Sequence, residues 1–239
     1  MVSEDELAKL IARVALGQSR YAERILKETG FLPPKTADTT LKGAIKLLTA
    51  KNPAKPYHRD GWMFQVMSWI ASHKQDGTAL IREPHMIHAH KGFDGIHVKL
   101  DAATKLVTVV VVCEEKATEQ PRGMITSKVW PEFKDIEKAE RDHQLLSEVI
   151  TMLRLHPGTD VEQAIEQIVW KNARTYRLAI TVGEADDPVA TFEGYPGAVT
   201  GAIARRRAET LPLADVRAWM VTIADKAIAH TKKLAAENV

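Results

Sequence analysis

The pattern of apolar and polar positions near the N-terminus predicts a group of short helices. Apolar residues recur every three or four positions behind a capping-box pair, Ser3 and Glu6, which predicts a first helix. Two further helices are predicted over 19–29 and 40–49, and the proline-containing segment 51–58 ends this part of the chain. We therefore expect a helical N-terminal extension.

The rest of the chain combines helical and strand periodicity. An aromatic-rich helix is predicted over 62–73, with Asp60 as its N-cap. Strands are predicted over 79–82 or 85–90, 95–100, 106–117 and 176–182, with a hairpin turn at 101–105. Further helices are predicted over 130–155, 199–208 and 213–237. This order is typical of an α/β protein.

The strand predicted over 106–117 ends in charged residues. Six of the seven residues from Leu106 to Val112 are β-branched, which is typical of a strand covered on both faces. Glu114 and Lys116 follow, and because side chains alternate across a strand, they project to one face while Glu115 projects to the other. Opposite charges on one face of a buried strand indicate a functional site.

A second carboxylate belongs to Asp94, 20 residues before Glu114 in the segment Gly-Phe-Asp-Gly-Ile. Mg²⁺ takes hard oxygen ligands, and water and phosphate oxygens complete its octahedron. Asp94 and Glu114 are candidate ligands, and Lys116 is placed to orient a nucleophile or to stabilise developing negative charge. The pattern predicts metal-dependent hydrolysis of a phosphodiester.

These residues resemble a known group of enzymes. The Asp94 segment, the hairpin, the apolar strand and Glu114-x-Lys116 are similar to the core of the PD-(D/E)xK nuclease superfamily, which includes restriction endonucleases and antiphage nucleases. The resemblance covers roughly residues 57–185. It implies that Asp94 and Glu114 bind the metal, that Lys116 is the catalytic lysine, and that the main-chain carbonyl of Glu115 is a further metal ligand.

The chain departs from the superfamily pattern at two places. Phe93 stands where the motif carries a proline, and the helix predicted over 62–73 has no glutamate to act as an additional acid. The first departure is common in the superfamily. The second leaves the number of metal ions open.

The resemblance also implies a fold and a function. The expected fold is a restriction-endonuclease-like α-β-β-β-α-β core with a mixed central sheet flanked by helices. The core would span 57–190, between helical extensions at 1–56 and 191–239. The implied activity is an Mg²⁺-dependent endonuclease, with Mn²⁺ as a substitute, acting on DNA, with RNA not excluded. It would serve a bacterial restriction or antiphage system under the control of a helicase or ATPase partner, or as a homo-oligomer.

Each half of the pattern also has a structural interpretation. An aspartate beside a glycine is commonly a turn former, and Glu and Lys after a strand commonly form a solvated edge. The alternative function is therefore a catalytically inactive nuclease-like fold that binds nucleic acid or supports assembly.

Histidines offer a second constellation. His85, His88, His90 and His97 lie close in the sequence, and a zinc site there is an alternative to ordinary strand or loop histidines. His90 is a candidate auxiliary group beside Asp94. Gln144 on the helix predicted over 130–155 is a second auxiliary candidate, with a solvated or capping role as its alternative.

Basic residues outside the acidic centre are candidates for phosphate contact. Arg122 and Lys128 follow the active strand, and Arg205, Arg206 and Arg207 are predicted to share one short helix. A solvated helix face or a subunit interface is the alternative for the arginine triplet.

Composition adds little to this picture. The chain has 239 residues and a formal net charge of +2, so charge neither requires nor excludes a nucleic-acid partner. Cys113, the single cysteine, is predicted to be a core thiol in a reducing cytoplasm. No run of about 18 apolar residues occurs and the N-terminus is acidic, so we expect a soluble cytoplasmic protein without a membrane partner.

Overall fold

The computed structural model describes residues 3–28, 30, 40–89, 91–169 and 173–236. Its contacts divide the chain into two units. The helical unit comprises Met1–Gly77, Glu83–Lys91 and Leu213–Val239, and the sheet unit comprises Thr78–Arg82 and Gly92–Pro212. This division differs from the predicted boundaries after residues 56 and 190, because the helices that begin at Tyr57 and Val216 pack with the N-terminal helices.

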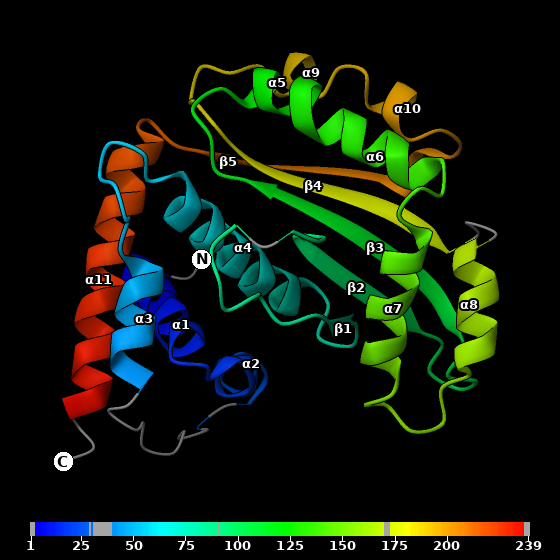
Figure 1. The fold of residues 1–239 in the computed structure, drawn as a ribbon, viewed down its shortest axis with the longest axis horizontal. Helices are drawn as coiled ribbons and strands as arrows, with labels where there is room; N and C mark the ends of the chain where they lie inside the picture. Colours follow the sequence, from blue (N-terminus) through cyan, green and yellow to red (C-terminus); the bar gives the residue numbers. More distant parts are fainter. Residues whose placement is uncertain (1–2, 29, 31–39, 90, 170–172, 237–239) are drawn as a thin grey trace. The chain divides into compact units, whose positions relative to one another are not determined.

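The sheet unit is built on five strands (Figure 1). They are β1 (Leu80–Ile81), β2 (Gly95–Leu100), β3 (Val107–Lys116), β4 (Arg174–Val182) and β5 (Arg206–Pro212), and they lie in this order across the sheet. β1, β2 and β3 are antiparallel neighbours, whereas β3, β4 and β5 are parallel. A hairpin joins β2 to β3, and the parallel strands require crossover connections.

The hairpin between β2 and β3 fixes their register. Asp101 accepts hydrogen bonds from the N–H groups of Ala103 and Thr104, and Lys105 takes a left-handed conformation with φ of 60°. This is the turn predicted over 101–105. The register places Gly95 opposite Cys113, so Asp94 lies at the charged end of β3.

Helices of the sheet unit follow β3 and β4. They are α5 (Pro121–Met124), the π-helical turn η2 (Ile125–Val129), α6 (Trp130–Glu137), α7 (Asp142–Leu153), α8 (Val161–Val169), α9 (Pro188–Thr191), α10 (Tyr195–Ala198) and the 3-10 turn η3 (Ile203–Arg205). Apolar side chains from one face of β2, β3 and β4 form a core with α6 and α7. Aromatic rings join this core: Trp130 and Tyr195 are stacked with 4.7 Å between their centroids, and Phe133 and Tyr176 are tilted with 4.9 Å between theirs.

Five helices lie in the described part of the helical unit. They are α1 (Glu4–Ala15), α2 (Ser19–Lys27), α3 (Leu41–Leu48), α4 (Tyr57–Gln75) and α11 (Val216–Ala236). The predicted capping box at Ser3 and Glu6 is present at the start of α1. Asp60 is not the N-cap of α4, because that helix already begins at Tyr57; its carboxylate is buried and pairs with Arg59 and Arg217.

The structure confirms a mixed α/β protein with a mixed sheet flanked by helices. Of the two alternatives for the first strand, 79–82 is confirmed by β1, and residues 85–88 are not a strand. Two element predictions were wrong. The helix expected over 130–155 is two helices, and the arginine triplet is not on one helix, because Arg206 and Arg207 belong to β5. Among the described residues, no helix is both long enough and apolar enough to cross a membrane.

Candidate active site at the end of strand β3

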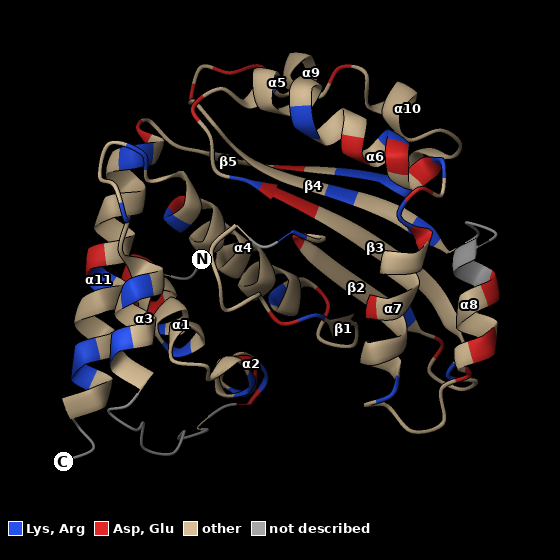
Figure 2. Cartoon of the chain, viewed as in Figure 1, with Lys and Arg blue, Asp and Glu red and all other residues tan. Residues whose placement is uncertain are grey.

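The charged residues at the end of β3 converge with Asp94. Most of β3 is uncharged, and acidic and basic residues appear only at its C-terminal end (Figure 2). The Lys116 Nζ atom lies 2.6 Å from Asp94 Oδ2 and 2.5 Å from Glu114 Oε2. The three residues predicted as catalytic are therefore brought together, with the ammonium between the two carboxylates.

Main-chain groups of β3 also face Asp94. The N–H of Glu115 donates to Asp94 Oδ2 at 3.0 Å. A residue in an extended strand directs its N–H and C=O groups to the same side, as the paired hydrogen bonds of antiparallel strands require. The main-chain carbonyl of Glu115 therefore faces the side of the strand where Asp94 lies.

Burial and the two opposite charges perturb all three groups. Burial raises the pKa of Glu114 well above its usual range, and the charge of Asp94 raises it further. Burial also acts to raise the pKa of Asp94, but Lys116 and the Glu115 N–H outweigh it, so that pKa is lowered. Burial acts to lower the pKa of Lys116, but the two carboxylates raise it. The lysine is therefore held in its charged form.

The donor set fits a hard cation. Glu114 Oε2 is buried and makes no hydrogen bond of good geometry with the described residues. The ammonium of Lys116 is the positive charge beside it. Two carboxylates and one main-chain carbonyl are the oxygen donors that Mg²⁺ prefers, and it keeps several waters. Among the described residues, no group of three or more His, Cys, Asp or Glu side chains is arranged to hold a metal.

Glu132 on α6 belongs to the same surroundings, although the sequence analysis missed it. Its charge contributes to the raised pKa of Glu114, after burial and the charge of Asp94. It forms an ion pair with Arg141, whose guanidinium lies 4.3 Å from the Phe93 ring centroid. An acid in the first turn of a helix is normally explained by the helix dipole, so no sequence signal marked it.

Gln144 is held by the same arginine. Its Oε1 accepts hydrogen bonds from Nε and Nη2 of Arg141 at 3.0 and 2.8 Å. The side chain is thus oriented by Arg141, which also contacts Phe93, the neighbour of Asp94. The other auxiliary candidate, His90, lies outside the described residues.

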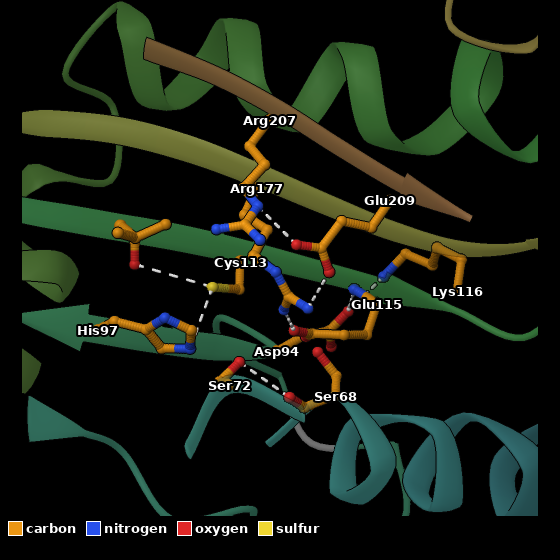
Figure 3. A network of polar contacts seen from close by, with 11 residues as sticks. Ser68, Ser72, Asp94, His97, Cys113, Glu115, Lys116, Arg177, Arg207 and Glu209 are labelled. Carbon is orange, nitrogen blue, oxygen red and sulfur yellow. Dashed lines mark hydrogen bonds and ion pairs between the residues drawn. The ribbon is translucent and has the colours of Figure 1, made fainter. Parts of the chain in front are cut away.

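Side chains on the opposite face of the sheet form an ion network, which Figure 3 draws together with Asp94 and Lys116. Arg177 on β4 pairs with Glu115 at 3.4 Å and also with Glu209 on β5. Glu209 pairs in turn with Arg207 at 2.6 Å. The side chain of Glu115 is therefore directed to the other face from Glu114, as strand alternation predicts.

Cys113 lies on the same face as this network. Its Sγ is 3.6 Å from His97 Nε2, and the thiol is buried. Burial raises the pKa of Cys113 well above its usual range. A neutral buried thiol is a poor nucleophile, so Cys113 has the properties of a core residue.

The histidines do not gather into a zinc site among the described residues. His88 Nε2 lies 2.7 Å from the Leu47 carbonyl oxygen, and the His85 carbonyl accepts a hydrogen bond from Trp62. Both belong to the helical unit, whereas His97 belongs to the sheet unit.

Most of the predicted phosphate contacts are occupied by other groups. Arg122 donates to the Thr191 and Glu193 carbonyls, and Arg206 donates to the Val199 carbonyl. Arg205 pairs with Glu137 and also donates to the carbonyls of Arg174 and Thr200. Arg207 pairs with Glu209. Lys128 is exposed on η2, without an ion pair to any described residue.

No model of a protein family matches this chain, and a search of curated proteins returns no significant match. A function must therefore be argued from the geometry at the end of β3.

Proposed function

We propose that this protein is an Mg²⁺-dependent endonuclease with a restriction-endonuclease-like core, acting on DNA. The observation that carries the proposal is the convergence of Asp94 and Glu114 on Lys116, in an arrangement that brings two carboxylates and an amine within 2.6 Å contacts. We extend it to the nuclease component of a bacterial restriction or antiphage system, controlled by a partner protein.

The chemistry assigns a role to each group. A bound Mg²⁺ would polarise the phosphate and lower the pKa of a coordinated water. Asp94, Glu114 and the main-chain carbonyl of Glu115 would hold that ion, because all three are hard oxygen donors on one side of the strand end. Lys116 remains charged, so it orients the attacking water or stabilises negative charge on the phosphate.

The strand order supports the same proposal. An antiparallel hairpin, β2 and β3, carries the acids, and a parallel crossover through α6 and α7 leads to β4. The succession of β2, β3, helices and β4 agrees with that part of the expected core; Asp94 directly precedes β2, and Glu114 lies near the end of β3.

A second function has its own support. Lys116 already forms ion pairs with both carboxylates, and no third acid or histidine completes a metal-binding group among the described residues. A nuclease-like fold without activity, which binds nucleic acid or serves assembly, would retain such an ion cluster for stability alone.

A cleavage assay separates the two functions. The purified chain is incubated with plasmid, single-stranded DNA and RNA in Mg²⁺, in Mn²⁺ and in EDTA. We expect Mg²⁺-dependent cutting of DNA that EDTA abolishes and Mn²⁺ restores, and a loss of at least about a hundredfold in rate for Glu114→Gln.

The matched control is Glu184→Gln, which removes an exposed carboxylate of the sheet unit. It should cut as the wild type does. Thermal unfolding of both variants establishes that they are folded. Cutting that persists in EDTA, or in folded Glu114→Gln, would contradict the proposed roles; a wild type that cuts none of the substrates would favour the inactive module.

A further inference from the structure

The helical unit carries a stretch of positive charge without any acidic residue. Between positions 39 and 59 the sequence contains no Asp or Glu. Its basic residues are Lys42, Lys46, Lys51, Lys55, His58 and Arg59. Figure 2 shows the same feature on α3, whose charged positions are all basic. Such a stretch creates a local positive potential that the net charge of +2 conceals.

A second segment lies against the first. Residues 84–91 also lack acidic side chains. His88 Nε2 lies 2.7 Å from the Leu47 carbonyl oxygen at the end of α3, and the His85 carbonyl is bound by Trp62 of α4 at 2.6 Å. The pKa of His88 is lowered by burial and, less strongly, by the charges of His58, Lys51 and Lys46. The two segments thus form one basic surface.

The lysines of this surface are available to a ligand. Lys42, Lys46, Lys51 and Lys55 are exposed, and none of them forms an ion pair with a described residue. Some lysines elsewhere in the helical unit are paired with acids: Lys9 with Asp5, Lys27 with Glu23 and Lys226 with Glu4. Because no acidic side chain of the described residues pairs with them, the four lysines repel one another.

Large apolar side chains are exposed on the same two segments. Tyr57 is 54% exposed beside His58, and Met86 and Ile87 are 40% and 59% exposed beside His88. The guanidinium of Arg217 lies 5.3 Å from the Tyr57 ring centroid. Exposed rings and aliphatic groups among cations match a ligand that has both negative charges and flat apolar faces.

We propose that this basic face, formed by Lys42, Lys46, Lys51, Lys55, His58 and His88 with Tyr57, Met86 and Ile87, binds single-stranded nucleic acid. The lysines contact the phosphates, and the apolar side chains contact the bases. A single strand exposes its base faces, whereas a duplex presents mainly phosphates to such a surface. The choice of nucleic acid among polyanions rests on the proposed function.

The test measures binding without cleavage. A fluorescein-labelled thymidine oligonucleotide of about 20 residues is titrated with the full chain in EDTA, and anisotropy is followed at several salt concentrations. The triple variant Lys46→Gln/Lys51→Gln/Lys55→Gln should bind about tenfold more weakly or worse, and its slope of log affinity against log salt should fall by about 2. Tyr57→Ala should weaken binding without changing the slope.

The control variant removes the same charge elsewhere. Lys74→Gln/Lys134→Gln/Lys138→Gln neutralises three exposed lysines that form no ion pair with described residues, and it should bind as the wild type does. Unchanged binding by the first triple variant overturns the inference, as does equal weakening by the control. Tighter binding of a duplex also overturns it, and so does binding of anionic lipid vesicles or polyglutamate in place of the oligonucleotide.

The binding assay and the cleavage assay fail independently. A chain that binds the oligonucleotide through the basic face but cuts no substrate contradicts the proposed nuclease alone. A chain that cuts DNA but whose triple variant binds normally contradicts the basic face alone.

Discussion

Lys116 supplies the positive charge that pairs with both carboxylates of the site, Asp94 and Glu114. Strand alternation predicted that it shares a face with Glu114, but not that its ammonium would contact Asp94 as well. That second contact requires the register of the hairpin, which depends on long-range pairing. Glu132 was missed for a related reason, since only the packing of α6 brings its charge near Glu114.

Removal of the Lys116 ammonium tests whether lysine and metal compete for the same two carboxylates. In Lys116→Met the two carboxylates lose their common cation, so we expect cleavage to be lost. We also expect the free energy of unfolding to fall by about 2–4 kcal/mol, less than for a fully buried pair because Lys116 is 22% exposed.

Thermal unfolding with and without Mg²⁺ checks this prediction. If the carboxylates bind the ion, Mg²⁺ should raise the melting temperature of Lys116→Met more than that of the wild type. The double variant Lys116→Met/Glu114→Gln should lose this response. Equal responses of the wild type and the single variant would argue against a shared metal site.

At the scale of elements, local periodicity located most helices and strands but not their interruptions. The helix predicted over 130–155 breaks after α6, where Ala139 has a φ of 67°. An apolar stripe continues across that break, so the sequence pattern alone did not reveal it. The first three residues of β5, 206–208, were predicted as the end of a helix over 199–208 because arginine and alanine are good helix formers, and pairing with β4 overrides that preference.

The left-handed alanine gives a prediction at this scale. A residue with a Cβ is strained at positive φ, whereas glycine is not. Ala139→Gly should therefore raise the free energy of unfolding by about 0.5–1 kcal/mol, measured by urea denaturation. Ala229→Gly, at an exposed position in the interior of α11, should lower it by about 1 kcal/mol. Destabilisation by both changes would refute the assigned strain.

At the scale of the whole molecule, the sequence indicated the α/β class but not the grouping of its elements. The aromatic-rich helix was assigned to the sheet-containing core because it precedes the strands. Its contacts instead place α4 with α1, α2 and α3. An amphipathic pattern shows which face of a helix is buried but not which element covers it. Domain boundaries therefore cannot be predicted from the pattern where the chain returns to an earlier unit.

Buried histidine in the helical unit predicts a pH dependence of stability. His73 is 6% exposed, packs against the Trp69 ring, and faces Glu23 and Lys27 of α2. Burial lowers its pKa to about 4. Because the unfolded chain binds a proton near pH 6.5 and the folded chain does not, stability is present above pH 6.5 and is lost as pH falls towards 4.

Urea denaturation between pH 7 and pH 4 measures this loss, which is on the order of 3 kcal/mol for His73. His73→Phe keeps the ring and removes the titration, so its stability should fall less over that range. His143→Gln changes an exposed histidine and should leave the wild-type slope intact. A slope unchanged in His73→Phe would rule out this residue as the source.

The two edge strands of the sheet, β1 and β5, determine how easily a strand of another molecule could pair with it. β1 has only two residues, and β5 alternates Arg207 and Glu209 with smaller side chains before ending at Pro212. A short strand at one border, and charge with a proline at the other, give a foreign strand little backbone to pair with. We therefore expect that Arg207, a candidate for phosphate contact in the sequence, instead discourages the pairing of a further strand with β5.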